Sequence, residues 1–362
     1  MSTTRLEPPH ASPQAPSSAS SVPSGPSAPS VTSPAHPTYA AAPFTASSSP
    51  SSPSVSGPTI VTTSGLTKTF SDRRGTRTVV DSLNLVVPRG AVYGFLGPNG
   101  SGKSTTMKML LSLVQPTDGE ILIQGEPMNR STRRRTLARI GSLIESPPGY
   151  GHLTGAENMR IVQRLLDLGE EDVRRAVSAV HMHEQMNKRV REYSLGMKQR
   201  LGIAMALVRR PSLLILDEPV NGLDPAGIEE IRRLVRDLAS DGVTVMVSSH
   251  LLGEIDRTAT VLGIIARGAL IFQGTRAELA GASAPDTLLG CSRPLAAAHL
   301  LSTRGAASTY KHGLLRVPGL SQQATADVVA LLVREGIGVH EVRQGEQTLE
   351  DVFMALTQGG GL

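Results

Sequence analysis

A glycine-rich stretch that ends in lysine and serine carries the most specific chemistry in this sequence. It runs Gly97-Pro98-Asn99-Gly100-Ser101-Gly102-Lys103-Ser104 and fits the pattern G-x-x-x-x-G-K-[ST], the P-loop. Residues 91–96 before it are typical of a short buried strand, and residues 104–114 after it are typical of a helix. A loop of this kind points backbone N–H groups at phosphate oxygens, and the helix N-terminus adds partial positive charge. The stretch therefore predicts a nucleotide phosphate site.

Three side chains of this stretch have predicted contacts with the nucleotide. Lys103 can reach the β- and γ-phosphates, Ser104 can ligate Mg²⁺, and Thr105 can touch the α-phosphate. The alternative is a glycine-rich turn between a strand and a helix that binds no ligand. Strand, loop, Lys-Ser pair and helix all occur in the required order, which favours the nucleotide site.

A second group of candidate residues follows an apolar run at residues 213–216. Four apolar residues followed by Asp217 and Glu218 predict a fully buried parallel strand with two carboxylates at its C-terminal edge. Open α/β sheets place their ligand chemistry at that edge. Asp217 can hold Mg²⁺ through water, and Glu218 can orient or deprotonate an attacking water.

Three further positions follow the P-loop in a fixed order. Ser194 is a good helix N-cap whose turn exposes N–H groups that suit a phosphate. Asp224 ends a tight turn before Pro225 at a helix start, and His250 follows a strand from which it can hydrogen-bond the γ-phosphate. Each has an ordinary interpretation as a cap, a turn or a strand-end histidine. Their joint occurrence in this order favours one shared site.

From about residue 59 to residue 279 the chain resembles ABC-type ATP-binding subunits, because residues 194–199 (SLGMKQ) match the signature motif of that family. The resemblance implies that ATP is bound with Mg²⁺, and that a homodimer forms because the signature residues meet ATP held by the P-loop of a second copy. It implies that Lys103, Ser104 and Thr105 contact the phosphates and Mg²⁺, that Asp217 is the Walker B acid and that Glu218 is the catalytic base. It further implies that Asp224 lies in the D-loop, that His250 is the switch histidine and that Phe70 stacks on the nucleotide base. Ser194 and Gly196 are implied to make contacts across the dimer.

One position departs from the usual family pattern. The loop after the predicted strand at residues 140–144 ordinarily begins with glutamine, whose amide meets Mg²⁺, whereas this chain has Glu145. A glutamate there resembles the exporters that give self-protection against lantibiotics and bacitracin. Residues 348–353 (TLEDVF) resemble the tail of drug and peptide exporters. The resemblance implies that Glu145 belongs to the catalytic site, with its oxygens in the Mg²⁺ shell or one water away from it. The alternative is a solvent-facing carboxylate on a loop.

The alternation of strands and helices predicts an α/β fold around a parallel-centred sheet. The family plan adds an antiparallel β subdomain and a helical subdomain over about residues 146–210. Apolar residues at 3–4 spacing predict helices over residues 157–168, 170–186 and 195–209, and the run at residues 133–135 (RRR) predicts the solvated face of a short helix. We expect a nucleotide-binding domain over residues 59–282 and a small C-terminal α+β accessory domain over residues 287–358. Residues 1–58 are rich in Ser, Pro and Ala and have only Arg5 and Glu7 as strongly charged residues, so we expect a disordered, dispensable extension.

The net charge, the cysteine content and the length of the apolar runs exclude few functions. The net charge of +5 over 362 residues suits ATP, nucleic acid or an anionic lipid surface equally well. Cys291 is the sole cysteine of the sequence, so an intrachain disulfide is excluded, and this cysteine usage is typical of a reducing compartment. Because Cys291 ends an apolar run, we expect it to be a small core residue. No apolar run approaches the roughly 18 residues of a membrane helix.

The sequence therefore predicts a cytoplasmic ATPase subunit that dimerises around two ATP molecules and drives a separately encoded integral-membrane permease, at the inner face of the cell membrane. Efflux of an antimicrobial peptide or drug is the expected task, with no specific nucleic acid partner. The alternative is a soluble ABC-type ATPase acting on the ribosome or nucleic acid, but such proteins usually carry two nucleotide-binding halves or a long coiled coil. A regulator that binds ATP without hydrolysis is disfavoured because Glu218 is present.

Overall fold

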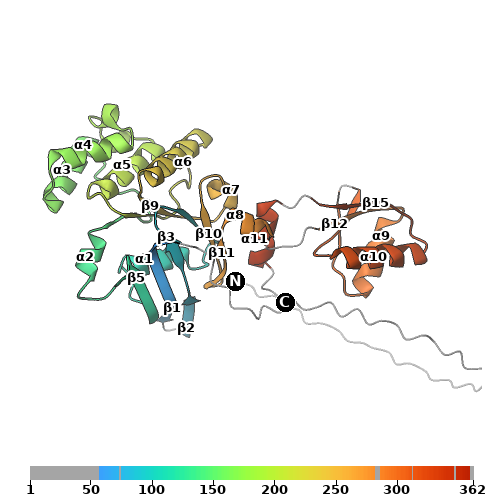
Figure 1. Ribbon diagram of the computed structural model, residues 1–362. Helices are drawn as coiled ribbons and strands as arrows, with labels where there is room; N and C mark the ends of the chain where they lie inside the picture. Colours follow the sequence, from blue (N-terminus) through green and yellow to red (C-terminus); the bar gives the residue numbers. More distant parts are fainter. Residues whose placement is uncertain (1–56, 73–74, 282–285, 312, 346–347, 359–362) are drawn as a thin grey trace, which may run out of the picture. The chain divides into compact units, whose positions relative to one another are not determined.

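The computed structural model describes residues 57–72, 75–281, 286–311, 313–345 and 348–358 (Figure 1). The extension expected over residues 1–58 lies outside the described residues, except for its last two positions. A membrane-crossing helix is absent from the described part of the chain.

A six-stranded sheet forms the centre of the fold. Its strands lie in the order β11-β10-β4-β9-β8-β7, and all neighbours are parallel except β10 and β11. Every residue of β4, β8, β9 and β10 is buried, as continuous apolar runs in a parallel sheet predict. The strands are β4 (Val92–Leu96), β7 (Ile140–Leu143), β8 (Leu213–Leu216), β9 (Thr244–Ser249), β10 (Val261–Ala266) and β11 (Ala269–Gly274).

A second, antiparallel sheet has the order β2-β1-β5-β6, with β3 paired to β1. Its strands are β1 (Thr59–Asp72), β2 (Gly75–Leu83), β3 (Val86–Pro88), β5 (Asp118–Ile123) and β6 (Glu126–Pro127). Helix α1 (Lys103–Leu110) contributes Met107, Met109 and Leu110 to an apolar cluster that contains side chains of both sheets. The second half of α1 therefore packs in a cluster shared with both sheets.

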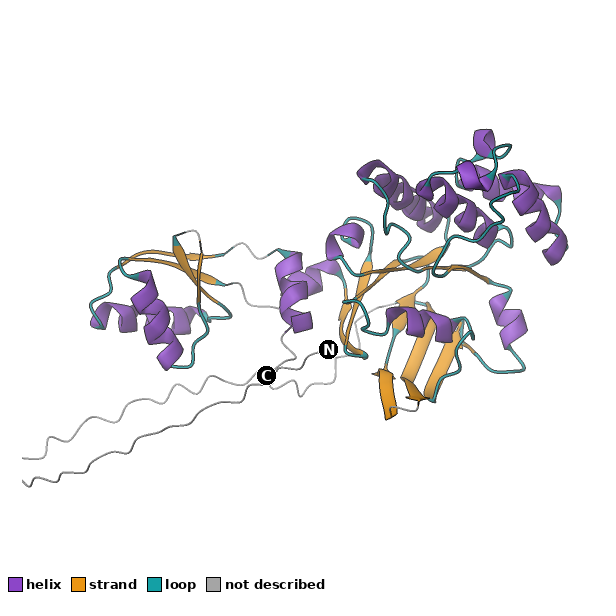
Figure 2. Ribbon diagram, turned by 180° about the vertical axis from the view of Figure 1, so that it is seen from behind, coloured by secondary structure: helices purple, strands orange, loops and turns teal. Residues whose placement is uncertain are grey.

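Helices α3 (Gly155–Leu166), α4 (Glu170–Ala179), α5 (Leu195–Leu207) and α6 (Pro225–Ser240) lie together on one side of the central sheet (Figures 1 and 2). The sequence pattern predicted a single helix over residues 170–186, which is wrong: α4 ends at Ala179 because His181 adopts a left-handed backbone with φ of 53°. Two 3-10 turns, His183–Gln185 and Val190–Glu192, then lead to α5.

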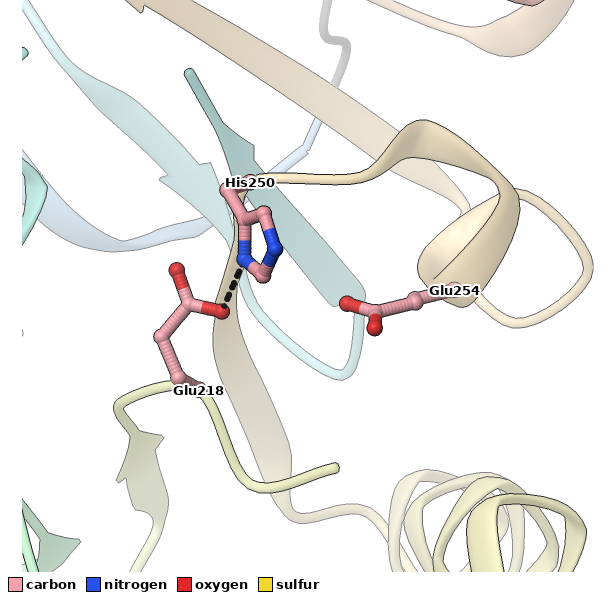
Figure 3. A group of neighbouring side chains, drawn as sticks. All are labelled: Glu218, His250 and Glu254. Atoms are coloured by element: carbon pink, nitrogen blue, oxygen red, sulfur yellow. Dashed lines mark hydrogen bonds and ion pairs between the residues drawn. The ribbon is translucent and has the colours of Figure 1, made fainter. Parts of the chain in front are cut away.

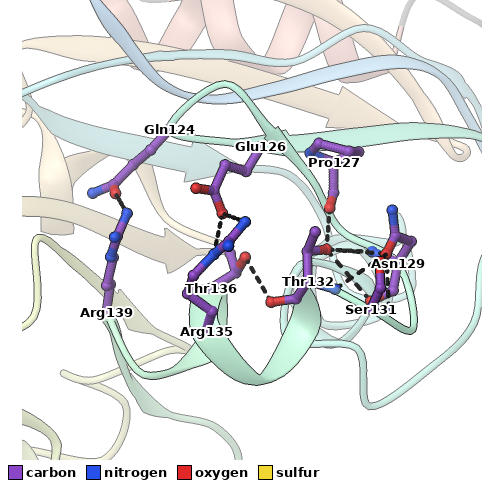
Figure 4. Close-up of polar contacts among 9 residues, drawn as sticks. All are labelled: Gln124, Glu126, Pro127, Asn129, Ser131, Thr132, Arg135, Thr136 and Arg139. Atoms are coloured by element: carbon purple, nitrogen blue, oxygen red, sulfur yellow. Dashed lines mark hydrogen bonds and ion pairs between the residues drawn. The ribbon is translucent and has the colours of Figure 1, made fainter.

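Between β6 and β7, helix α2 (Arg133–Leu137) carries the Arg133-Arg134-Arg135 run on an exposed face, as predicted. A local polar network holds this segment (Figure 4): Arg135 pairs with Glu126 at 2.9 Å, and Arg139 donates to the Gln124 side-chain carbonyl at 3.0 Å. Two other short helices follow β9 and β11, namely α7 (Leu252–Ile255) and α8 (Arg276–Gly281).

The C-terminal region forms its own antiparallel sheet in the order β13-β14-β12-β15. Its elements are β12 (Thr287–Cys291), α9 (Pro294–Thr303), β13 (Thr309–Lys311), β14 (Leu314–Val317), α10 (Gln322–Arg334) and β15 (Val339–Gln344). Cys291 is buried in the apolar cluster of this sheet, which confirms its predicted core position. The final helix, α11 (Leu349–Gln358), instead buries Val352 and Phe353 in the main cluster around the central sheet.

Candidate functional site

The P-loop connects β4 to α1, as the sequence predicted. Lys103 is the first residue of α1, and its ammonium donates to the Gly97 carbonyl oxygen at 2.6 Å. Gly102 has φ of 111°, a conformation that favours glycine. At Gly97 a β-carbon would lie 2.2 Å from the Ile265 carbonyl oxygen, so only glycine fits this close approach of β4 to β10. Packing and backbone conformation thus both require glycine in the loop.

A cavity of about 230 Å³ lies over this loop. It brings together residues from the P-loop, the end of β8, the end of β9 and the antiparallel sheet. Its lining residues are Val79, Asn99, Gly100, Gly102, Lys103, Ser104, Thr105, Glu218, Asn221 and His250. Six of these residues lie in or just after the predicted P-loop, and Glu218 and His250 were predicted to be catalytic. Val79 and Asn221 were not among the predicted site residues.

The two carboxylates after β8 have different surroundings. Asp217 is buried, and one of its oxygens accepts a hydrogen bond from the Ser248 hydroxyl at 2.6 Å. The same hydroxyl accepts the Glu218 N–H at 2.8 Å, while Glu218 adopts a left-handed φ of 48°. Ser248 therefore fixes both acids, although the sequence analysis did not select it. The available signal was its position in the strand that pairs with β8, two residues before His250.

His250 and Glu218 are in direct contact. The His250 Nδ1 atom lies 2.9 Å from a Glu218 carboxylate oxygen (Figure 3). An ionised carboxylate can only accept, so the imidazole donates this bond. The other Glu218 oxygen lies 3.4 Å from the Lys103 ammonium. Glu218 thus connects the P-loop lysine to the histidine that follows β9.

Two predicted contact residues lie apart from the lining of this cavity. Phe70 is 45% exposed on β1, with the Lys68 ammonium 4.9 Å from its ring centroid. Glu145 follows β7, and its side chain is 68% exposed and pairs with Lys108 of α1 at 2.6 Å. That hydrogen bond and charge hold the pKa of Glu145 below its usual range. Base stacking by Phe70 and metal contact by Glu145 stay predictions.

The signature and D-loop residues form a second group that does not line the cavity of their own chain. Ser194 caps α5 by accepting the Met197 N–H, and Asp224 caps α6 by accepting the Gly227 N–H, both at 3.2 Å. A Leu223 methyl lies 3.8 Å from where a β-carbon of Gly196 would stand, so the two helix starts are close together. The first N–H groups of a helix have no partner within the helix, and Ser194 and Asp224 each satisfy one of them.

The residues around the P-loop fit a hydrated magnesium ion bound with nucleotide phosphates. Among the described residues the Ser104 hydroxyl has no hydrogen-bond partner, and Asp217 commits only one oxygen to Ser248. Hydroxyl and carboxylate oxygens are the ligands that a hard cation prefers. Ser104 and Asp217 are therefore the residues that would hold Mg²⁺.

Comparison with known proteins gives consistent matches. Residues 80–221 match the family model described as ABC transporter. The chain is 39% identical over 308 residues to a bacitracin transport ATP-binding protein of Enterococcus faecalis, covering 84% of this chain and 98% of the relative. It is 44% identical over 199 residues to a lantibiotic transport ATP-binding protein of Streptococcus pyogenes, covering 55% of this chain and 85% of the relative.

Among solved structures, the fold is similar to a dimeric ATP-binding cassette in a post-hydrolysis state bound to ADP and phosphate. The TM-score is 0.53 at 26% identity, over 60% of this chain and 98% of the cassette. This chain belongs to the ATP-binding subunits of ABC transporters.

Proposed function

We propose that this chain hydrolyses ATP, as a dimer, to drive a membrane permease that exports an antimicrobial peptide or drug. The observation that carries the proposal is the cavity in which Lys103, Glu218 and His250 meet. A lysine for phosphate, a carboxylate for water and a histidine beside it are the groups that ATP hydrolysis needs.

The residues of the cavity have distinct roles in this reaction. The P-loop N–H groups and Lys103 bind the β- and γ-phosphates, and Ser104 and Asp217 hold Mg²⁺. When bound, Mg²⁺ neutralises charge on the phosphate oxygens. Lys103 exchanges its contact with Glu218 for the γ-phosphate, which leaves Glu218 available to accept a proton from the attacking water. His250 keeps hold of Glu218 and reaches the same phosphate.

Dimerisation completes the site in this proposal. Ser194 and Gly196 present the start of α5 outside their own cavity, so the N–H groups there serve the ATP of a second copy. The dimeric state of the similar ADP-bound cassette supports this arrangement. Each chain then supplies the P-loop of one site and the signature of the other.

The transport task follows from the relatives. Bacitracin and lantibiotic transport are the tasks named for the two relatives, and both substrates are antimicrobial peptides. We propose the same substrate class here, with the subunit held at the inner membrane face by its permease and no nucleic acid partner. We retain residues 59–282 as the nucleotide-binding domain and residues 1–58 as a dispensable extension. Of the accessory domain predicted over residues 287–358, we keep residues 287–344, because α11 packs into the cluster around the central sheet.

Glu145 is the residue through which we propose that ATP and permease are coupled. It follows the edge strand β7 and contacts Lys108 one turn beyond Ser104 on α1, so it links the phosphate-binding helix to an exposed loop. Glu145→Gln should keep ATPase activity of the isolated chain within a few-fold, whereas Glu145→Ala should impair resistance in cells.

Two measurements test the proposal. Phosphate release by the purified chain with Mg-ATP tests hydrolysis, and co-expression with a permease encoded beside it tests transport through resistance to bacitracin, lantibiotics and cytotoxic drugs. Hydrolysis without protection against any of these compounds would reject the exporter assignment. Protection by Glu145→Ala equal to wild type, at equal expression, would reject the coupling role.

A further inference from the structure

His250 occupies a short turn between β9 and α7 that is anchored on both sides. On one side, the Ser249 carbonyl accepts the N–H of Gly97, the first P-loop residue, at 3.3 Å. On the other side, the Ser249 hydroxyl accepts the Leu251 N–H at 3.0 Å. It can donate its one proton to the Glu254 carboxylate or to the Leu251 carbonyl at 3.0 Å, and the charged carboxylate is the stronger acceptor. The backbone on either side of His250 is therefore fixed, and Glu254 is the side chain that fixes the hydroxyl.

A second contact comes from α6, the helix that begins at the D-loop. Arg232 of α6 donates through Nε to the Glu254 carbonyl at 2.8 Å and through its terminal nitrogen to the Gly253 carbonyl. The last carbonyl groups of a helix lack partners within the helix, and α7 has only four residues. Arg232 therefore caps α7 with a positive charge at the end of the helix that favours it.

The contacts of Glu254 and Arg232 both act on the segment that carries His250, residues 249–255. Figure 3 shows the His250 ring between the Glu218 and Glu254 side chains, and each residue has a ligand-type atom within 4.8 Å of the others. Glu254 has no direct bond to Glu218 among the described contacts, so any influence on the reaction passes through the turn that presents His250.

We propose that Glu254 and Arg232 are positioning residues for ATP hydrolysis. Glu254 holds the Ser249–Leu251 turn closed, Arg232 holds α7 to the D-loop helix, and together they keep the His250 imidazole in bonding range of Glu218. This inference rests on the proposed ATPase function. It also links α6, whose first residues meet a second copy in the proposed dimer, to Glu218 through α7 and the turn that carries His250.

The test compares kcat for ATP with nucleotide affinity in the full chain. Glu254→Ala and Arg232→Met should lower kcat roughly 10- to 100-fold, because small misplacements of reacting groups have effects of that size. Nucleotide affinity should stay within about twofold, since the phosphate-binding residues are unchanged. Glu254→Gln should be intermediate, because its amide oxygen still accepts from Ser249.

Matched controls are available in the same chain. Arg233→Met changes the neighbouring arginine, which is exposed and has no ion pair among the described residues. Glu171→Gln removes an exposed carboxylate whose ion pair among the described residues is with Arg174. Both should keep wild-type kcat.

Hydrogen exchange of residues 247–257 provides a readout that does not need activity. Exchange there should accelerate in Glu254→Ala and Arg232→Met and stay unchanged in both controls. Unchanged exchange in Glu254→Ala, or wild-type kcat in an active protein, would overturn the inference. A wild-type chain without ATPase activity would contradict the proposed function instead, and the exchange measurement would still decide the positioning role. If Glu254→Ala fails to fold, Glu254→Gln gives the same comparison.

Discussion

The Lys103 ammonium lies 2.6 Å from the Gly97 carbonyl oxygen and 3.4 Å from a Glu218 carboxylate oxygen. Its side chain is only 6% exposed, and the Pro98 carbonyl oxygen also accepts from it at 3.4 Å, so Glu218 supplies the negative charge beside two carbonyl acceptors. A buried cation without such partners is strongly unfavourable. In the proposed reaction, nucleotide phosphates replace Glu218 as the partner of Lys103, and this exchange would free the carboxylate that we propose as the base.

Replacing Lys103 by alanine should weaken nucleotide binding by about 10- to 100-fold, the usual range for a lost hydrogen bond to a charged group. Calorimetric titration with a non-hydrolysable ATP analogue measures the affinity. Lys108→Ala is the control, because this lysine lies on the same helix but pairs with Glu145 at the surface. Equal affinities for wild type and Lys103→Ala would remove Lys103 from the phosphate site.

Replacing Glu218 by glutamine should separate binding from hydrolysis. The amide keeps the size and hydrogen-bonding capacity of the side chain but cannot accept a proton, so turnover should fall at least about 100-fold while nucleotide still binds. The trapped complex should elute as a dimer in size-exclusion chromatography with Mg-ATP and as a monomer without it. Turnover at the wild-type level would show that another group acts as the base.

The C-terminal helix should be part of the stability of the main domain. Phe353 is 6% exposed in the apolar cluster around the central sheet, so Phe353→Ala should lower the free energy of unfolding by about 3–5 kcal/mol. Met354 on the same helix is 47% exposed, and Met354→Ala should have little effect. Urea denaturation of both variants makes the comparison; equal midpoints would mean that α11 does not stabilise the main domain.

The contact between Glu145 and Lys108 should make a small, pH-dependent contribution to stability. The contact lowers the pKa of Glu145 from its ordinary value of 4.5, so its stabilisation is fully present above that value and disappears as the pH falls through the lowered pKa. Glu145→Gln lacks the titrating group. The wild type should therefore exceed this variant in melting temperature at pH 7, and the difference should vanish well below pH 4.5. A constant difference across that range would contradict the ion pair.

Candidate site residues could be predicted from the sequence when they belong to a short local motif with recognisable chemistry. The P-loop and the acids after β8 are encoded in consecutive residues, so spacing alone predicted that they lie at the ends of neighbouring elements. Ser248 is different, because its function depends on a bond to Asp217 across two paired strands. Val79 lines the cavity from a separate sheet, which spacing does not reveal.

Two further features depended on information that apolar periodicity does not contain. The helix predicted to reach residue 186 stops at Ala179, yet Val180 and Met182 are buried as its pattern required. Burial was predicted correctly there, while the turn at His181 was not. Glu145 was expected near the metal, and its pairing with Lys108 came from the position of α1 relative to β7, a tertiary distance.

Residues 287–344 have the topology of an inserted module, because the helix that follows them, α11, packs back into the core cluster of the main domain. The chain leaves the main domain after α8, whose Leu279 is in the same core cluster, and returns to that cluster with Val352 and Phe353. The two ends of the insert are paired neighbours, since Thr287 lies opposite Gln344 and the Gly345 N–H donates to the Asp286 carbonyl at 2.7 Å. A module with adjacent ends can be deleted or exchanged through a short linker without breaking the host domain. Chimaeras that swap this insert between exporters are therefore geometrically feasible, and they would keep the C-terminal helix in place.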